Sequence, residues 1–316
     1  MKKNMTRRDF TKLSASATAF FAVSPAGGFR AGGGKTLTIP LGAPVFEEYK
    51  DPEGWINALK RLGYRAAYTP VKIEDDETTV KAYAKAASKA GIIISEVGAW
   101  SNPISPDKTQ RKEAFDKCVR SLQLADQLGA NCCVNVSGSR NKEYWAGPHM
   151  ENLTDETFDM VVESTREIID AVKPKHTYFA LEAMPWSFPY SADSYLRLLR
   201  AIDRERFAVH LDPMNMITSP EIFFHNAEMI RDCFRKLGPH IRSCHAKDMI
   251  IREDIYTPQL TETRAGLGNM DYTVFLTELS KLDNIPLMIE HLKTPEEYKL
   301  AADYIRSVAA ENGISM

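Results

Sequence analysis

The chain has 316 residues, 44% of them hydrophobic and 26% charged, which supports a sizeable core and excludes disordered and fibrous classes. Its 40 Lys and Arg residues nearly balance 42 Asp and Glu residues, so the formal net charge of -2 gives no positive field for nucleic acid, and no nucleic-acid partner is expected. Five sparse cysteines form neither a disulfide framework nor a CxxC zinc site.

The N-terminus has the layout of a signal peptide. Residues 1–12 are basic, residues 13–23 are mildly apolar, and small residues follow. Within this stretch, Arg7 and Arg8, followed by Phe10 and Lys12, resemble the twin-arginine export motif. We therefore predict a signal peptide at 1–26 that is read by the twin-arginine export machinery, a flexible Gly-rich linker at 27–35, and a periplasmic protein.

The apolar stretch of this signal is well short of the about 20 residues that cross a bilayer, so no stable membrane anchor is expected. Twin-arginine signals mark proteins that are exported folded, often because a cofactor or metal must be chosen first. The signal is therefore a weak indication of a metal.

Residues 36–316 alternate between short apolar or β-branched runs and longer amphipathic segments. The predicted strands are 37–45, 64–69, 92–99, 132–137, 178–183, 207–212, 241–247 and 286–291. The predicted helices include 75–90, 108–128, 156–172, 195–202, 222–237, 272–282 and 295–310. Eight such units predict a (β/α)8 TIM barrel, whereas a doubly wound sheet usually has fewer units and a GxGxxG turn, which is missing. The connection 249–270 is too long for a plain turn and predicts an active-site flap.

Four successive strands, the fifth to the eighth, end in a side chain of metal-ligand type. These side chains are Glu182, Asp212, His245 and Glu290. The C-terminal ends of barrel strands meet in one mouth, so the four should converge. A lone acid at a strand end is as often a surface salt bridge or a helix cap, but four in a row among apolar residues would be costly as unpaired charges. Three carboxylates and one imidazole favour one divalent ion, Mn²⁺, Mg²⁺ or Co²⁺, with Zn²⁺ as an alternative.

These motifs resemble those of the sugar phosphate isomerase/epimerase superfamily of xylose-isomerase-like TIM barrels, which includes inosose dehydratases and ketose 3-epimerases. The resemblance spans 36–313 and is carried by Leu181-Glu182, Leu211-Asp212, His245-Ala246-Lys247-Asp248, Gly266-Leu267-Gly268 with Asp271, and Ile289-Glu290. It implies that Glu182, Asp212, His245 and Glu290 hold one divalent metal. It also implies that Glu182 and Glu290 are the catalytic acid and base.

The implied function is isomerisation or epimerisation of a sugar or keto-sugar by proton transfer through a metal-stabilised enediolate. If a leaving group lies β to the carbonyl, the same chemistry makes the chain a lyase or dehydratase on a keto-inositol or 3-keto-glycoside. Ketose 3-epimerases of this fold have a His and a Glu where this chain has Asn215 and Phe188, so their particular substrate does not carry over.

Further side chains near the expected mouth are candidates for substrate binding. They are His210, Lys247, Trp100, Asn102, Trp186, Arg140 and Arg264. Plainer alternatives are core hydrogen bonding for the histidine, barrel packing for the tryptophans, and a solvated loop charge for the arginines. Glu96, which shares a strand with Trp100, either lines the pocket or forms a buried salt bridge.

Two other functions compete with the enzyme. A non-catalytic periplasmic sugar-binding barrel would need no paired acid and base, so Glu182 and Glu290 argue against it. A DNA-repair endonuclease of the related barrel type would need several zinc ions and more histidines. The sequence leaves open which sugar is bound and whether it is phosphorylated. It also leaves open the oligomeric state, and a homo-oligomer is one of the alternatives.

Overall fold

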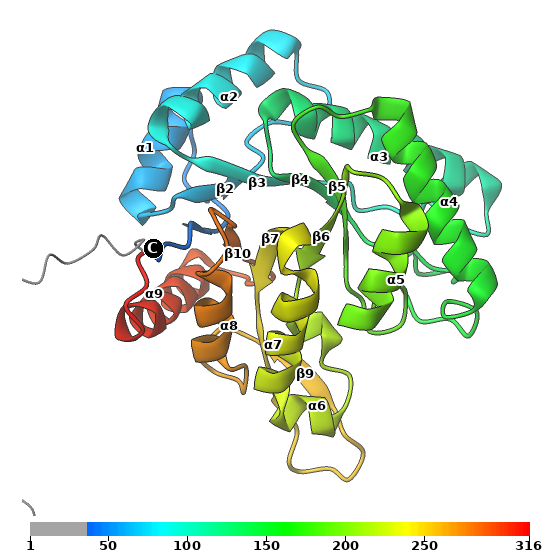
Figure 1. Cartoon of the computed structure of the whole chain (residues 1–316). Coiled ribbons are helices and arrows are strands. Elements are labelled where there is room, and N and C mark those ends of the chain that lie inside the picture. Colours follow the sequence, from blue (N-terminus) through cyan, green and yellow to red (C-terminus); the bar gives the residue numbers. More distant parts are fainter. Residues whose placement is uncertain (1–36) are drawn as a thin grey trace, which may run out of the picture. The chain divides into compact units, whose positions relative to one another are not determined.

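The structure, a computed structural model, describes residues 37–316 and contains a barrel of parallel strands (Figure 1). The strands are β1 (Leu41–Gly42), β2 (Ala66–Tyr68), β3 (Ile93–Gly98), β4 (Cys132–Asn135), β5 (Tyr178–Glu182), β6 (Phe207–Leu211), β7 (Ile241–Ala246) and β10 (Leu287–Ile289). Their order is β1-β10-β7-β6-β5-β4-β3-β2. Between the two edges, the N–H of Arg65 donates a 3.0 Å hydrogen bond to the carbonyl of Leu41. The predicted TIM barrel is confirmed.

Helices follow the strands and surround them (Figure 1). They are α1 (Pro52–Leu62), α2 (Glu77–Ala90), α3 (Lys108–Leu128), α4 (Asp155–Val172), α5 (Ala192–Ile202), α6 (Pro220–Phe224), α7 (Asn226–Leu237), α8 (Tyr272–Leu279) and α9 (Pro295–Glu311). The first three end at Gly63, Gly91 and Gly129, whose φ of 67–68° is left-handed and turns the chain into the next strand. No helix within 37–316 is long and apolar enough for a membrane span. The predicted signal peptide and linker lie outside the described residues.

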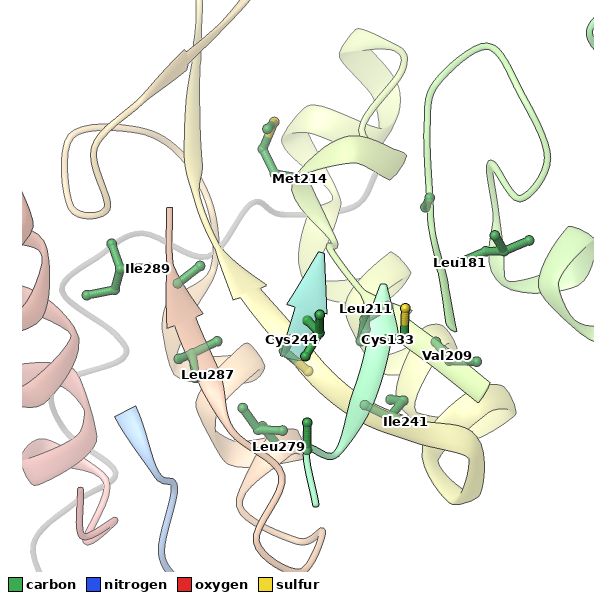
Figure 2. Packing of buried hydrophobic residues seen from close by; sticks show 14 of the residues in the cluster. Cys133, Leu181, Val209, Leu211, Met214, Ile241, Cys244, Leu279, Leu287 and Ile289 are labelled. Atoms are coloured by element: carbon green, nitrogen blue, oxygen red, sulfur yellow. The ribbon is translucent and has the colours of Figure 1, made fainter. Parts of the chain in front are cut away.

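Alternation along the strands divides the barrel's apolar side chains into two layers. Leu181, Leu211 and other outward residues belong to the main core against the helices (Figure 2). A separate small cluster faces the barrel interior and consists of Cys132, Val134, Ala180 and Ala208. Because successive side chains of a strand point to opposite faces, the residues that follow Leu181 and Leu211 also face the interior. Those residues are Glu182 and Asp212.

The long connection after β7 forms a hairpin of β8 (Asp248–Ile251) and β9 (Leu260–Thr263), which the sequence analysis did not resolve into strands. Asp248 is buried and anchors the returning chain. Its Oδ2 accepts hydrogen bonds from Gly266 (3.0 Å) and Gly268 (3.1 Å), and its Oδ1 accepts one from Met270 (2.9 Å). A Cβ at position 268 would lie 2.2 Å from Asp248 Oδ1, so only glycine fits there. Asp248 and the Gly-Leu-Gly segment therefore hold the hairpin at the barrel mouth.

Candidate metal centre and substrate cavity

The four predicted metal ligands converge at the C-terminal ends of β5, β6, β7 and β10. One ligand atom from each of Glu182, Asp212, His245 and Glu290 lies within 4.8 Å of the others. Nδ1 of His245 is 2.8 Å from Glu290 Oε1, 3.2 Å from Glu182 Oε1 and 3.9 Å from Asp212 Oδ2. The structure thus brings together side chains that are separated by up to 108 residues along the chain, since Glu182 and Glu290 stand at positions 182 and 290.

The spacing and the donor set of these atoms, three carboxylate oxygens and one imidazole nitrogen, fit a divalent cation. Ligands at about 2.0–2.2 Å from an ion, in tetrahedral or octahedral geometry, are about 3.0–3.5 Å from one another. The measured separations of 2.8, 3.2 and 3.9 Å span this range. Asp212 Oδ2 and Glu290 Oε1 are buried, and their close contacts are ion pairs with Lys247 and, for Glu290, with His245. This group could therefore hold a metal ion.

Lys247 places an ammonium among the same carboxylates. Its Nζ is 2.8 Å from Asp212 Oδ2 and 3.6 Å from Glu182 Oε1, and it also contacts Glu290 Oε1. Burial alone would lower the pKa of Lys247, but the three carboxylates outweigh burial and raise it well above its usual value. Three carboxylates and one ammonium leave a formal charge of about -2, which one divalent ion would neutralise.

The two glutamates of the site differ in acidity. Burial raises the pKa of Glu182 to about 7, although Lys247 and His245 oppose this rise. Burial also acts on Glu290, but there His245 and Lys247 prevail and hold the pKa well below its usual range. Asn215 donates a 3.1 Å hydrogen bond from Nδ2 to Glu182 Oε1, a contact that sequence reasoning did not anticipate. At neutral pH, Glu182 is therefore poised between its two protonation states while Glu290 is ionised.

A second buried group supports His245 from its other side. Glu96 Oε1 is 3.1 Å from His245 Nε2, and Glu96 Oε2 is 3.5 Å from His210 Nδ1, which also contacts Ser243 Oγ. Burial would raise the pKa of Glu96, but His245 and His210 lower it overall. Burial, together with His245, lowers the pKa of His210 to about 4. Glu96 thus holds the imidazole so that Nδ1 faces the other ligands, the arrangement of carboxylate–histidine pairs at metal sites.

A cavity of about 880 Å³ opens above these residues. Three of the predicted substrate-binding residues line it: Trp100, Trp186 and Lys247. The wall also contains residues that the sequence analysis missed, namely Tyr68, Tyr144, Trp145, Glu262 and His291. The aromatic pair at 144–145 stands in the loop after the fourth predicted strand. This position beyond a strand end was the one feature of the sequence that could have placed the pair at the cavity.

The structure does not bring the other four predicted substrate-binding residues to the cavity wall. His210 is fully buried beneath the site. The side-chain amide of Asn102 forms hydrogen bonds with a neighbouring loop: Nδ2 donates to the carbonyl of Ser139 (2.7 Å), and Oδ1 accepts from the Ser139 N–H (3.0 Å). Arg140 faces Glu151 (3.5 Å) and Glu156 (3.9 Å). Arg264 donates to the carbonyl of Ala265 (3.2 Å).

Solved structures with the same fold come from several bacteria. One is a xylose isomerase-like TIM barrel protein from Mycobacterium smegmatis in complex with magnesium (16% identity, TM-score 0.61, covering 87% of this chain and 98% of that one). Another is D-psicose 3-epimerase with D-tagatose from Clostridium cellulolyticum (16%, 0.60, 85% and 99%). A third is the probable 3-DHS dehydratase AsbF from Bacillus anthracis (14%, 0.64, 86% and 99%). At these identities the likeness shows the fold alone.

No curated protein shows a significant match to the sequence. The family described as xylose isomerase-like TIM barrel matches residues 56–308, which is most of the chain. Together with the barrel and its convergent strand ends, this match shows that the chain belongs to the xylose isomerase-like TIM barrel family.

Proposed function

We propose that the chain is a metal-dependent isomerase or epimerase that transfers a proton on a sugar or keto-sugar. The observation that carries the proposal is that Glu182 and Glu290 flank one candidate cation site. The sheet order places β7 and β6 between β10 and β5, so the two carboxylates reach the site from different sides, with His245 and Asp212 between them. A pair of this kind can serve two positions of one substrate carbon, which a binding protein does not need.

In this proposal Glu182, Asp212, His245 and Glu290 hold one divalent ion, Mn²⁺, Mg²⁺ or Co²⁺, with Zn²⁺ as the alternative. When bound, such an ion supplies Lewis-acid polarisation of a sugar carbonyl and stabilises the charge that develops as the α-proton leaves. The magnesium complex of the Mycobacterium smegmatis relative supports this choice of ion class.

The protein's own groups then move the proton. Glu290 is ionised and accepts a proton at a carboxylate oxygen, whereas Glu182, with a pKa of about 7, can give or take one near neutrality. Asn215 fixes the rotamer of Glu182 through its 3.1 Å hydrogen bond. The Lys247 ammonium remains charged and can donate a hydrogen bond to a substrate oxygen.

A lyase or dehydratase is the second candidate, because the same proton removal expels a β leaving group. The probable dehydratase among the solved structures of this fold supports this second candidate. The two reactions differ in their products, since only elimination releases water or an alcohol.

Proton exchange from keto-sugars in D₂O, followed by NMR with the Mg²⁺-loaded protein, tests the proposal. Glu182→Gln and Glu290→Gln keep one oxygen donor but cannot take up a proton, so each should lose about 10²–10⁴-fold in turnover. Glu278→Gln, on α8 beside Lys281, is the control and should behave as wild type. Metal content is measured on every variant so that loss of the ion is not mistaken for loss of the base.

Unchanged turnover in a metal-loaded Glu182→Gln or Glu290→Gln protein would mean that the glutamates are ligands only. A wild-type protein that binds metal and sugar but exchanges no proton would be a sugar-binding barrel.

A further inference from the structure

Three of the four tryptophans of the chain line the cavity above the carboxylates. Trp55 alone is in the core, at 1% exposure, whereas Trp100 and Trp145 are 37% and 38% exposed on the cavity wall and Trp186 is partly exposed beside them. Tyr144, at 59% exposure, extends this wall. Large aromatic side chains gain free energy by burial, so their concentration at the mouth of a polar site indicates a ligand that covers them.

Contacts between loops support part of the aromatic wall. Nε1 of Trp186 donates a 2.7 Å hydrogen bond to the carbonyl of Ala146, which joins the loops after β5 and β4. The indole of Trp100 folds over Gly98, where an added Cβ would lie 2.2 Å from the indole Nε1. Asn102 ties its own loop to Ser139 at the start of the loop that carries Trp145. The rings of Trp100 and Trp186, which have such contacts, lose less entropy when a ligand stacks on them.

The charges on the wall favour a neutral ligand. Among the described residues that line the cavity, the cationic side chains are Lys247, which faces three carboxylates, and His291, whose Nδ1 is 3.2 Å from Glu262. Arg140 and Arg264 lie outside the wall, as described above. A bound phosphate normally needs unpaired Arg or Lys donors, and here it would instead meet the carboxylates of Glu96 and Glu262.

The wall and the cation site form two levels of one cavity. The carboxylates stand at the strand ends, and the tryptophans stand on the loops beyond β3, β4 and β5. The volume of about 880 Å³ is large within the about 300–1,000 Å³ range of small-molecule sites. A single sugar ring held at the carboxylates would leave the upper level open.

We infer that Trp100, Trp145 and Trp186 form a ring-stacking subsite, and that the substrate is a neutral glycoside whose reacting sugar carries a keto group and a second ring, rather than a free monosaccharide or a sugar phosphate. This inference rests on the proposed function for the reaction at the lower level. The sugar that reacts lies at the carboxylates, and the ring attached to it lies on the tryptophans.

The test is binding of phenyl β-D-glucoside, methyl β-D-glucoside and glucose 6-phosphate to the full Mg²⁺-loaded protein, by calorimetry and by tryptophan fluorescence. The phenyl glycoside should bind at least about 10-fold tighter than the methyl glycoside and should quench or shift the fluorescence. In Trp145→Ala this preference should shrink by about 2–10-fold, the range for one aromatic contact. Phe224→Ala, an exposed aromatic residue on α6 outside the cavity wall, should leave it unchanged.

Equal affinity for the phenyl and methyl glycosides, or no detectable binding of either at the solubility limit, overturns the inference. So does binding of glucose 6-phosphate as tight as that of phenyl β-D-glucoside. Binding is measured without turnover, so a protein that prefers the phenyl glycoside but exchanges no proton contradicts the proposed function and leaves the subsite standing. Proton exchange without any preference for the phenyl glycoside supports the proposed function and contradicts the subsite.

Discussion

Replacing Lys247 by Met should destabilise the metal-free protein and strengthen its affinity for a divalent ion. Lys247 is the ammonium that faces Asp212, Glu182 and Glu290, and its side chain is only 2% exposed. Removing one partner of a buried charged group leaves the others uncompensated, which costs about 3–5 kcal/mol. At about 2–4 °C per kcal/mol for a domain of this size, the melting temperature of the EDTA-treated variant should fall by about 6–20 °C.

The same change should favour the ion, because the site then carries about one more negative charge. A unit charge at about 4 Å contributes several kcal/mol near a protein surface, so affinity for Mn²⁺ should rise about tenfold or more. Added Mn²⁺ should therefore restore the melting temperature of the variant by more than it raises that of wild type.

Thermal unfolding with and without Mn²⁺, together with calorimetric titration of the ion, measures both effects. Lys236→Met is the matched control, because Lys236 also pairs with two carboxylates, Asp193 at 2.6 Å and Asp232 at 2.8 Å, but on the outer surface. Its loss should cost at most about 1 kcal/mol and leave Mn²⁺ affinity unchanged. If Lys247→Met is as stable as wild type without metal, or binds Mn²⁺ no more tightly, the charge balance described for this site is wrong.

Three further outcomes are expected. Glu96→Gln should weaken Mn²⁺ binding by about 10–100-fold, because it removes the charge that holds His245; an unchanged dissociation constant would contradict this. His210 has a folded pKa of about 4, below the about 6.5 of the unfolded chain, so acid protonates the unfolded state first. Between pH 6.5 and pH 4, the free energy of unfolding of wild type, measured by urea unfolding, should therefore fall by about 3 kcal/mol more than that of His210→Gln. If the two free energies fall in parallel with pH, the low pKa of His210 is wrong. Finally, we propose export by the twin-arginine route: replacing Arg7 and Arg8 by Lys should leave the precursor in the cytoplasm, and normal periplasmic recovery would count against it.

The barrel and the convergence of the four candidate ligands could be predicted from local patterns. A period of two along each strand sets which residues face inward, and one strand–helix unit sets the spacing between strand ends. Those two rules suffice to place Glu182, Asp212, His245 and Glu290 together, because each ends a strand of the same barrel. The helices that end at glycines 63, 91 and 129 do so for an equally local reason, the left-handed backbone of these glycines.

The remainder of the site depends on contacts between residues far apart in the chain. Glu96 contacts His245, which is 149 residues away along the chain. From the sequence, Glu96 could equally have lined the pocket or formed a buried salt bridge. Asn102 was predicted to bind substrate, but its side-chain amide is hydrogen-bonded to the backbone of Ser139 in a neighbouring loop.

The periodicity of strands and helices thus predicts both the barrel and the convergence of the four candidate ligands. Three features emerge only on folding: Lys247 stands among those carboxylates, Arg140 and Arg264 stay outside the cavity, and Trp145 forms part of its wall. A loop's path and a long side chain's rotamer depend on the distant partner that satisfies their charges and hydrogen bonds, and no periodicity encodes that partner.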